Sequence, residues 1–364
     1  MVKHTLLTCL LLITALLCAR AEEKDRNLVF SSEQRAPVTS VKNQGRSSTC
    51  WCFSGVSFVE AEIIRQNRIR KEADYPAISE AFILGRSLHD RAEKYVRLKG
   101  NLRAAPGSEG PDVVEVIRKY GFIPRNLYPL PDFSCDTTRF RELTTSVRSY
   151  LKGIVERRDK ELSKYWIAPF DAMVEGYIGQ RPEGFDAAAY RDRWKFDATQ
   201  YVSVVSLTNV PYYETCVLEV MDNWRWTPSI NLPLDEMVAL IDRAIDRGYT
   251  VHIAADITQR GYNHDGYATL VPEDSDFSLA LPEEEIKTTA EERQARYDAQ
   301  VTTDDHAMHL VGRARDQYGR KFYVIKDSHG EYGPFKGYLY MSEEYVRMNV
   351  LMIMVHKSLL ESPL

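Results

Sequence analysis

The sequence has few of the residues that mark fibrous or disordered chains. It contains 19 glycines and 16 prolines among 364 residues, well below the share found in collagen-like or low-complexity proteins. It also lacks an excess of positive charge, because its formal net charge is −5, which argues against a dedicated nucleic-acid-binding protein. These absences indicate a globular chain, long enough for one large domain or two smaller ones that bury a core without disulfides or metal ions.

Long apolar runs are also scarce, and the one that exists lies at the N-terminus. Residues 6–17 are almost entirely apolar, basic Lys3 precedes them, and Ala19-Arg20-Ala21 follows as a small-x-small cleavage site. This pattern predicts a signal peptide over residues 1–21, cleaved after Ala21, and an exported (periplasmic or secreted) protein. An uncleaved anchor and a lipoprotein attached at Cys18 are the alternatives. No later segment approaches the ~18 apolar residues of a membrane span, so none is expected in the mature chain.

Cysteine is sparse as well, with six residues in the whole chain. Two of them fall in the predicted leader, and the remaining four are Cys50, Cys52, Cys135 and Cys216. Four thiols do not make a disulfide scaffold, and a bond between Cys135 and Cys216 is left open. The Cys-x-Cys pair lacks the second pair of ligands that a zinc site needs, so no metal ion or cofactor is expected.

Helical and strand-like patterns occupy different halves of the chain. The spacing of apolar residues predicts helices over 50–67, 79–99, 113–120, several stretches of 136–200, 234–247 and 282–298. Short β-branched and aromatic runs predict strands over 202–207, 251–255, 309–314, 321–326, 337–341 and 350–355. The fold class is therefore α+β, helical in its first part and strand-rich in its second.

Four residues combine into a candidate site for nucleophilic catalysis. Cys50 lies at the predicted start of a helix, where the helix dipole stabilises a thiolate. Such a nucleophile needs a base, a group that orients the base, and donors for the developing oxyanion. His306 opens one predicted strand and Asp327 follows the next, so pairing of those strands would bring the two side chains together. Gln44, six residues before Cys50, offers an amide NH2 for the oxyanion.

The motifs around these residues resemble those of papain-like cysteine peptidases. The stretch from Gln44 to Ser54 reads QGRSSTCWCFS, which matches the family's Gln-to-Cys spacing and its Cys-Trp-x-Phe-Ser signature, and Ile78-Ser79-Glu80 matches a Leu-Ser-Glu element. Cys50 and His306 are 256 residues apart, against about 130–150 in papain and cathepsins. That separation and the sequence His306-Ala307-Met308 resemble the bleomycin hydrolase and aminopeptidase C branch, which has a helical insertion.

The resemblance implies a fold, a set of roles and a reaction. It implies a two-lobed papain-like fold with a helical lobe over 22–135, a helical insertion over 136–200 and an antiparallel β-rich lobe over 201–364. It implies Cys50 as nucleophile, His306 as general base and acid, Gln44 as oxyanion donor with the Cys50 amide, and Asp327 in the orienting position. The implied reaction is peptide-bond hydrolysis through an acyl-thioester, as a cysteine-type peptidase (EC 3.4.22) of aminopeptidase type on short peptides. Relatives in this branch form hexamers, which makes a homo-oligomer the expected assembly.

Three departures from the family pattern widen the range of expected functions. Asp327 stands where the family has Asn, and His329 stands where it has the shielding Trp. These changes keep a catalytically weak or inactive peptide-binding homologue as the alternative function. Only residues 358–364 follow Lys357, whereas a longer C-terminal arm restricts the aminopeptidase branch to terminal residues, so endopeptidase or oligopeptidase action is also open.

The alternative interpretation of the same region is the metal site of a metal-dependent hydrolase. Six potential ligands occur there: Asp304, Asp305, His306, His309, Asp327 and His329. However, residues three apart on a strand point to opposite faces, and no H-E-x-x-H motif is present. We therefore expect no metal site, and we expect Asp304 and Asp305 to lie in a solvated loop. Cys52 and Trp51 are expected to be packing residues.

Overall fold

The computed structural model describes residues 27–158, 161–263 and 266–360. The signal peptide predicted at residues 1–21 lies outside these described residues. Within them, no helix combines the length and the apolar character that crossing a membrane requires.

Helices are the main secondary structure of the described residues before residue 200. The helices are α2 (Cys50–Gln66), η1 (Glu72–Asp74), α3 (Glu80–Arg97), α4 (Gly110–Tyr120), α5 (Thr137–Val155), α6 (Ile167–Ile178), α7 (Ala187–Arg193), η2 (Ala198–Gln200), α8 (Leu234–Asp246), α9 (Ala290–Asp298), α10 (Glu343–Asn349) and η3 (Lys357–Leu359). The helix expected over 282–298 is wrong in its first half, because α9 begins only after Thr289. A capping box between Thr289 and Glu292 fixes that start.

Most strands of the described residues follow residue 200, and they belong to one eleven-stranded sheet. Its strands are β1 (Ser32–Arg35), β2 (Tyr201–Val205), β3 (Thr215–Val217), β4 (Pro228–Asn231), β5 (Val251–Ala255), β6 (Tyr262–Asn263), β7 (Tyr267–Ala268), β8 (His306–Arg315), β9 (Lys321–Lys326), β10 (Tyr338–Ser342) and β11 (Val350–His356). The order is β3-β4-β2-β11-β5-β8-β9-β10-β7-β6, and β1 pairs with β8. All pairs are antiparallel except β2 with β4 and β10 with β7. The α+β prediction is confirmed.

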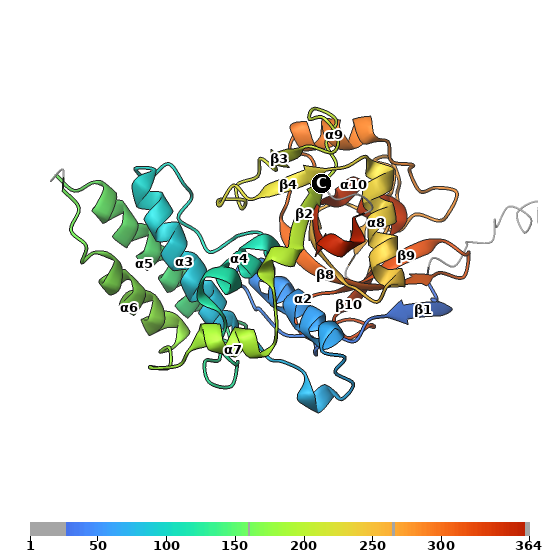
Figure 1. Ribbon diagram of the computed structural model, residues 1–364. Helices are drawn as coiled ribbons and strands as arrows, with labels where there is room; N and C mark the ends of the chain where they lie inside the picture. The colour runs from blue at the N-terminus through green and yellow to red at the C-terminus, as the bar shows by residue number, and fades with distance from the viewer. Residues whose placement is uncertain (1–26, 159–160, 264–265, 361–364) are drawn as a thin grey trace, which may run out of the picture.

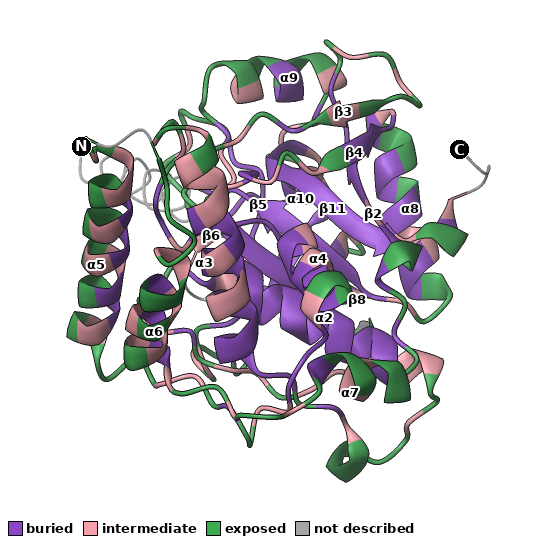
Figure 2. Cartoon of the chain, turned by 60° about the vertical axis from the view of Figure 1, so that its left-hand side comes forward, coloured by how far each residue is buried: buried purple, intermediate pink, exposed green. Residues whose placement is uncertain are grey.

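Helix α2 lies between the remaining N-terminal helices and the sheet. Figure 1 shows α3, α5 and α6 grouped at one end of the molecule, with α2 and α4 between them and the strands. In Figure 2 both α2 and the central strands are buried along most of their length. One apolar cluster runs continuously from α2 through α6, so the helices within the predicted insertion share a core with α2 and α3. The boundaries proposed for the insertion stay a prediction.

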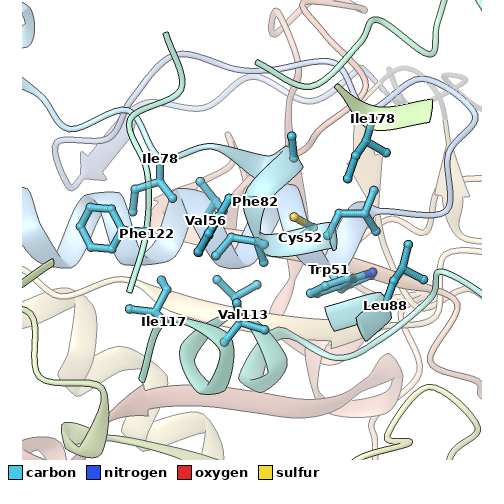
Figure 3. Packing of buried hydrophobic residues seen from close by; sticks show 14 of the residues in the cluster. Trp51, Cys52, Val56, Ile78, Phe82, Leu88, Val113, Ile117, Phe122 and Ile178 are labelled. Carbon is cyan, nitrogen blue, oxygen red and sulfur yellow. The ribbon is translucent and has the colours of Figure 1, made fainter. Parts of the chain in front are cut away.

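The residues that flank the candidate nucleophile anchor α2 in this core. Trp51 and Cys52 are fully buried, and they pack among apolar side chains from α3, α4 and α6 (Figure 3). The Trp51 indole Nε1 donates a hydrogen bond to the Pro106 carbonyl at 2.8 Å. Both residues are confirmed as packing residues, and they hold the first turn of α2 in a fixed position. A separate core of α8, α10 and the sheet supports the strands from the other side.

Candidate active site

Cys50 is the first residue of α2, as the sequence predicts. Its side chain is partly exposed, whereas the Cys52 thiol two residues later is buried. The Ser54 hydroxyl donates to the Cys50 carbonyl oxygen at 2.7 Å, which reinforces the first turn. A thiol at this end of a helix faces unpaired backbone N–H groups, which stabilise its thiolate form. Cys50, Cys52, Cys135 and Cys216 are all free thiols, so no bond joins Cys135 to Cys216.

His306 and Asp327 meet because β8 and β9 pair antiparallel. His306 is the first residue of β8, and Asp327 directly follows the last residue of β9. The His306 Nε2 donates to the Asp327 Oδ1 at 2.7 Å, and both side chains are buried. The contact predicted from adjacent strands is therefore present. His309 has a different partner, because its Nδ1 meets the Ser57 hydroxyl on α2. That His306 and His309 point to opposite faces stays a prediction.

Asp327 accepts more hydrogen bonds than an orienting residue requires. Its second oxygen, Oδ2, accepts from the His329 Nδ1 at 2.9 Å and from the Tyr332 hydroxyl at 2.8 Å. The His306 and His329 rings lie 5.1 Å apart with an interplanar angle of 30°. His329 thus covers the pair as a hydrogen-bonded ring rather than as an apolar one. Sequence reasoning missed Tyr332, and its position five residues after Asp327 carried no signal.

The charges at this site favour a protonated imidazole. Burial alone would lower the pKa of His306, but hydrogen bonds and charge interactions with Asp327 and with the neighbouring Cys50 side chain raise that pKa to about 10. Burial likewise opposes the charged form of Asp327, yet His306 and His329 hold the pKa of this carboxyl far below its usual value. At neutral pH the site therefore holds an imidazolium between a carboxylate and the Cys50 sulfur.

Gln44 is tied to the segment that carries Asp327. The Ser328 hydroxyl donates to the Gln44 Oε1 at 2.6 Å, and the Gln44 backbone N–H donates to the Ser328 carbonyl oxygen at 2.7 Å. Gly45 continues the chain with φ of +61°, and a side chain there would collide with the backbone of residues 133–134. Since the amide oxygen is occupied by Ser328, the Gln44 NH2 group is turned away from that contact. Ser328 was not singled out from the sequence, although it lies within the motif around Asp327.

The solvated loop predicted before His306 is confirmed for Asp305 and only in part for Asp304. Asp305 is exposed and accepts a hydrogen bond from the Ile257 backbone N–H at 3.0 Å. Asp304 is only partly exposed, and one of its carboxylate oxygens is buried. The loop folds back against the segment before α4, and burial there raises the pKa of Asp304. Sequence alone gave no sign of this packing, which depends on contacts between residues almost 200 positions apart.

Two groups of side chains in the described part of the chain could hold a metal ion. They are His306 with Asp327 and His329, and His89 with Asp90 and Glu93, and in each group the ligand atoms lie within 4.8 Å of one another. In the first group, one nitrogen of each ring already donates to Asp327. A metal ion between them would have to break both bonds, so the geometry fits acid–base chemistry better.

Comparison with known proteins gives the family. The Peptidase C1-like family model matches residues 182–363. Aminopeptidase C of Lactococcus lactis subsp. lactis is 24% identical over 375 residues, which cover 89% of this chain and 81% of that protein. Aminopeptidase C of Streptococcus thermophilus is 24% identical over 390 residues, covering 94% and 85% respectively.

A solved structure shares the fold. The crystal structure of PepW from Lactobacillus rhamnosis HN001 matches with a TM-score of 0.70 and 17% identity, over 91% of this chain and 82% of that one. The resemblance noted in the sequence is thereby confirmed. This chain belongs to the Peptidase C1-like family, as an aminopeptidase C-like cysteine-type peptidase with the papain fold.

Proposed function

We propose that the protein hydrolyses peptide bonds with Cys50 as nucleophile and His306 as general base and acid. The observation that carries this proposal is the position of His306, whose ring interacts with Asp327 through one nitrogen and is close enough to Cys50 to share a hydrogen bond. A nucleophile, a base in contact with it and a third group that orients the base are the parts that covalent hydrolysis requires.

The reaction follows from the charges of these groups. The Cys50 thiolate attacks the carbonyl carbon of the substrate, and the oxyanion accepts hydrogen bonds from the Gln44 NH2 and the Cys50 backbone N–H. The His306 imidazolium then protonates the leaving amine, and an acyl-thioester remains on Cys50. His306, now neutral, removes a proton from water, which attacks the thioester. The acid leaves, and the thiolate–imidazolium pair is restored.

The experiment is labelling with a thiol-directed epoxide, read by mass spectrometry, together with hydrolysis of aminoacyl and peptidyl fluorogenic substrates. We expect one covalent adduct on Cys50 and hydrolysis of short peptides with a free N-terminus, as the names of the aminopeptidase relatives suggest. Cys50→Ala should abolish both signals, whereas Cys216→Ala, at another partly exposed free thiol, should keep them. A folded protein that is neither labelled nor active would refute the proposal.

A catalytically weak peptide-binding homologue is the second candidate. It is favoured by the hydrogen bond and the charge that Asp327 directs at His306, because they stabilise the imidazolium and make it a poorer acid toward the leaving amine. The His329 side chain is also 42% exposed, so water reaches the pair from that side. Labelling of Cys50 without turnover would identify this case.

Export and assembly complete the proposal. Residues 1–21 direct the chain out of the cytoplasm, and cleavage after Ala21 leaves Glu22 as the first residue. N-terminal sequencing of protein recovered outside the cytoplasm of an expressing host tests this, since a product that still carries residues 1–21 would contradict it. By resemblance to its branch the mature chain assembles as a homo-oligomer, up to a hexamer, and light scattering on the purified protein measures its mass.

A further inference from the structure

Three acidic side chains from distant parts of the sequence converge beside the candidate nucleophile. Glu109 immediately precedes α4, Asp222 lies in the loop between β3 and β4, and Asp304 lies two residues before His306. The Glu109 and Asp304 carboxyl groups are within hydrogen-bonding reach of each other, and the charges of Asp222 and Cys50 act on Glu109. Asp222 also packs against Gly107, where a methyl group would collide with its carboxylate.

Within the described residues, all three carboxyl groups have oxygens without a hydrogen-bond partner. Glu109 is 5% exposed, and both of its oxygens lack a hydrogen-bond donor, as do one oxygen of Asp222 and one of Asp304. Among the ion pairs of the described residues, none involves Glu109, Asp222 or Asp304. Glu109 occupies the N-cap position of α4, yet its side chain makes no capping hydrogen bond, so a role in the helix start does not account for its burial.

The two nearest guanidinium groups do not satisfy these carboxylates. Arg91 is buried and donates to the Gly107 carbonyl oxygen, and its charge acts on Asp222 from beyond ion-pair distance. Arg103 is exposed, and it too makes no ion pair with them. A buried carboxylate without a partner is strongly disfavoured, and native proteins normally pair it or protonate it. Burial accordingly raises the pKa of Glu109, with Asp304 and Asp222 adding to the effect.

Glu109 lies beside the candidate active site, where a peptide substrate would bind, and not on a distant surface. The segment that carries Glu109 is fixed to the nucleophile's own helix by the hydrogen bond from Trp51 to Pro106, three residues before Glu109. Asp304 is joined through two peptide bonds to His306, the proposed general base. A ligand that contacts both carboxyl groups would therefore sit within reach of the Cys50 sulfur, where the scissile bond must lie.

We infer that Glu109, together with Asp222 and Asp304, binds a protonated primary amine of the peptide substrate. An ammonium group has three N–H donors and one positive charge, which suits carboxylate oxygens that lack a hydrogen-bond donor. A divalent cation fits less well, because the groups with ligand atoms clustered within 4.8 Å in the described residues are two others. This inference rests on the proposed function, since it places the amine on a peptide that lies across Cys50.

The amine can come from the N-terminus of the peptide or from a lysine side chain, and three probes of equal length separate these sources. They are tetrapeptide amides that differ only at the first residue: norleucine with a free N-terminus, N-acetyl-lysine carrying a free side-chain amine, and N-acetyl-norleucine with no amine. Their affinities are measured by calorimetry on the full chain carrying Cys50→Ala, so that no turnover is needed, and kcat/KM is measured on the unaltered protein.

We expect at least one amine-bearing probe to bind about tenfold or more tightly than the N-acetyl-norleucine probe. Preference for the first probe identifies the N-terminal amine, and preference for the second identifies lysine. Added to Cys50→Ala, Glu109→Gln should abolish the preference. Glu115→Gln, on the same helix but in an exposed ion pair with Arg118, should leave it intact. Asp222→Asn provides a second test if the Glu109 variant fails to fold, as judged by its melting curve.

The outcomes separate this inference from the proposed catalysis. Amine preference in binding without turnover would sink the catalytic proposal and support the site. Turnover with no preference for an amine, or a preference that survives both Glu109→Gln and Asp222→Asn, would overturn the site and leave the catalysis standing. Equal binding of all three probes, with equal kcat/KM, also overturns it, and the carboxyl groups would then be a proton-sharing structural cluster.

Discussion

At the scale of single residues, Asp327 has the largest effect on the site. Its carboxylate holds His306 through one oxygen and both His329 and Tyr332 through the other. A neutral amide at this position could orient the imidazole, but it would supply no charge to keep the ring protonated. Asp327, together with Cys50, therefore raises the pKa of His306 against the effect of burial.

Replacing Asp327 by Asn should shift the pH range in which Cys50 reacts. With the carboxylate gone, the pKa of His306 falls from about 10, and we expect the imidazolium to be lost at least about one pH unit earlier. The measurement is the rate of Cys50 alkylation by the anion iodoacetate, which the imidazolium attracts, as a function of pH. Tyr332→Phe removes one hydrogen bond but no charge. The alkaline limb of its pH–rate curve for alkylation should therefore move much less. An unchanged alkaline limb of this curve in Asp327→Asn would contradict the conclusion that the Asp327 carboxylate keeps His306 protonated.

Replacing Gln44 should lower the catalytic rate and hardly change substrate binding. Loss of an oxyanion donor typically lowers kcat by about 10²- to 10³-fold, so Gln44→Ala should show this drop with KM nearly unchanged. Ser328→Ala removes the hydroxyl that holds the Gln44 Oε1 and should produce a smaller loss in the same direction. Steady-state kinetics on one fluorogenic peptide tests both variants. A loss that appears in KM alone would show that Gln44 contributes to substrate binding instead.

At the scale of elements, the position of Cys50 depends on how closely α2 and α4 approach each other. Gly55 lies on the side of α2 that faces α4, and a methyl group there would come within 2.6 Å of the Val113 Cγ2. Close contact at this point keeps the first turn of α2 next to the segment that carries Glu109. A glycine within a helix is unfavourable by itself, so its presence here reflects packing rather than local preference.

Gly55→Ala should destabilise the protein in spite of the better helix propensity of alanine. The gain from propensity is at most about 1 kcal/mol, whereas overpacking in a core costs about 1–3 kcal/mol, so we expect a net loss of stability. Urea unfolding followed by circular dichroism measures the free energy of unfolding. In the double variant Gly55→Ala/Val113→Ala the contact with the Val113 Cγ2 is gone and only the Cβ at 3.0 Å remains. Gly55→Ala should therefore cost less stability in the Val113→Ala background than in the unaltered protein. Stabilisation by Gly55→Ala would show that the two helices can separate at no cost.

At the scale of the whole molecule, a buried polar network joins the helical part to the sheet. Lys326, the last residue of β9, donates to the Ser57 hydroxyl of α2 at 2.8 Å. On the same helix, Glu60 accepts from Lys42 at 3.0 Å and from Thr39 at 2.6 Å. Burial is the main reason why the pKa of Lys326 falls to about 7, although Glu60 opposes this change.

The contributions of two buried groups, His306 and Lys326, to the stability of the folded protein should nearly cancel between about pH 7 and 10. The folded-state pKa of His306 is raised to about 10, so its contribution is lost as the pH rises from its unfolded value near 6.5. The folded-state pKa of Lys326 is lowered to about 7, so stability increases over nearly the same range, because the folded protein has lost this proton while the unfolded chain still holds it. Each effect amounts to about 1.4 kcal/mol per pH unit.

Lys326→Met should remove this compensation. We expect the free energy of unfolding of this variant, measured in urea between pH 7 and 10, to fall with rising pH by about 1.4 kcal/mol per unit relative to the unaltered protein. Lys152→Met, at a side chain that is 64% exposed, should give a curve parallel to that of the unaltered protein. Parallel curves for both variants would mean that Lys326 keeps its proton in the folded state.

The sequence by itself determined the family, the α+β class and the residues of the candidate site. The motif around Cys50 and the strands that end at His306 and Asp327 could be read locally, because helix starts and strand patterns depend on neighbouring residues. The short strands β3, β4, β6 and β7 were missed because two to four residues carry little periodic signal. Their pairing depends on the sheet edges that they join.

Only the tertiary structure decided which polar groups surround the site. Tyr332 and Ser328 reach Asp327 and Gln44 through chain reversals that no local pattern predicts. Glu109, Asp222 and Asp304 come from three loops, and the sequence analysis placed Asp304 in solvent. The physical reason is that the burial of a side chain and the charges around it depend on how the elements pack against one another. Helices and strands that are distant in the sequence must pack together before it is decided whether a side chain has hydrogen-bond partners or a carboxylate is buried without them.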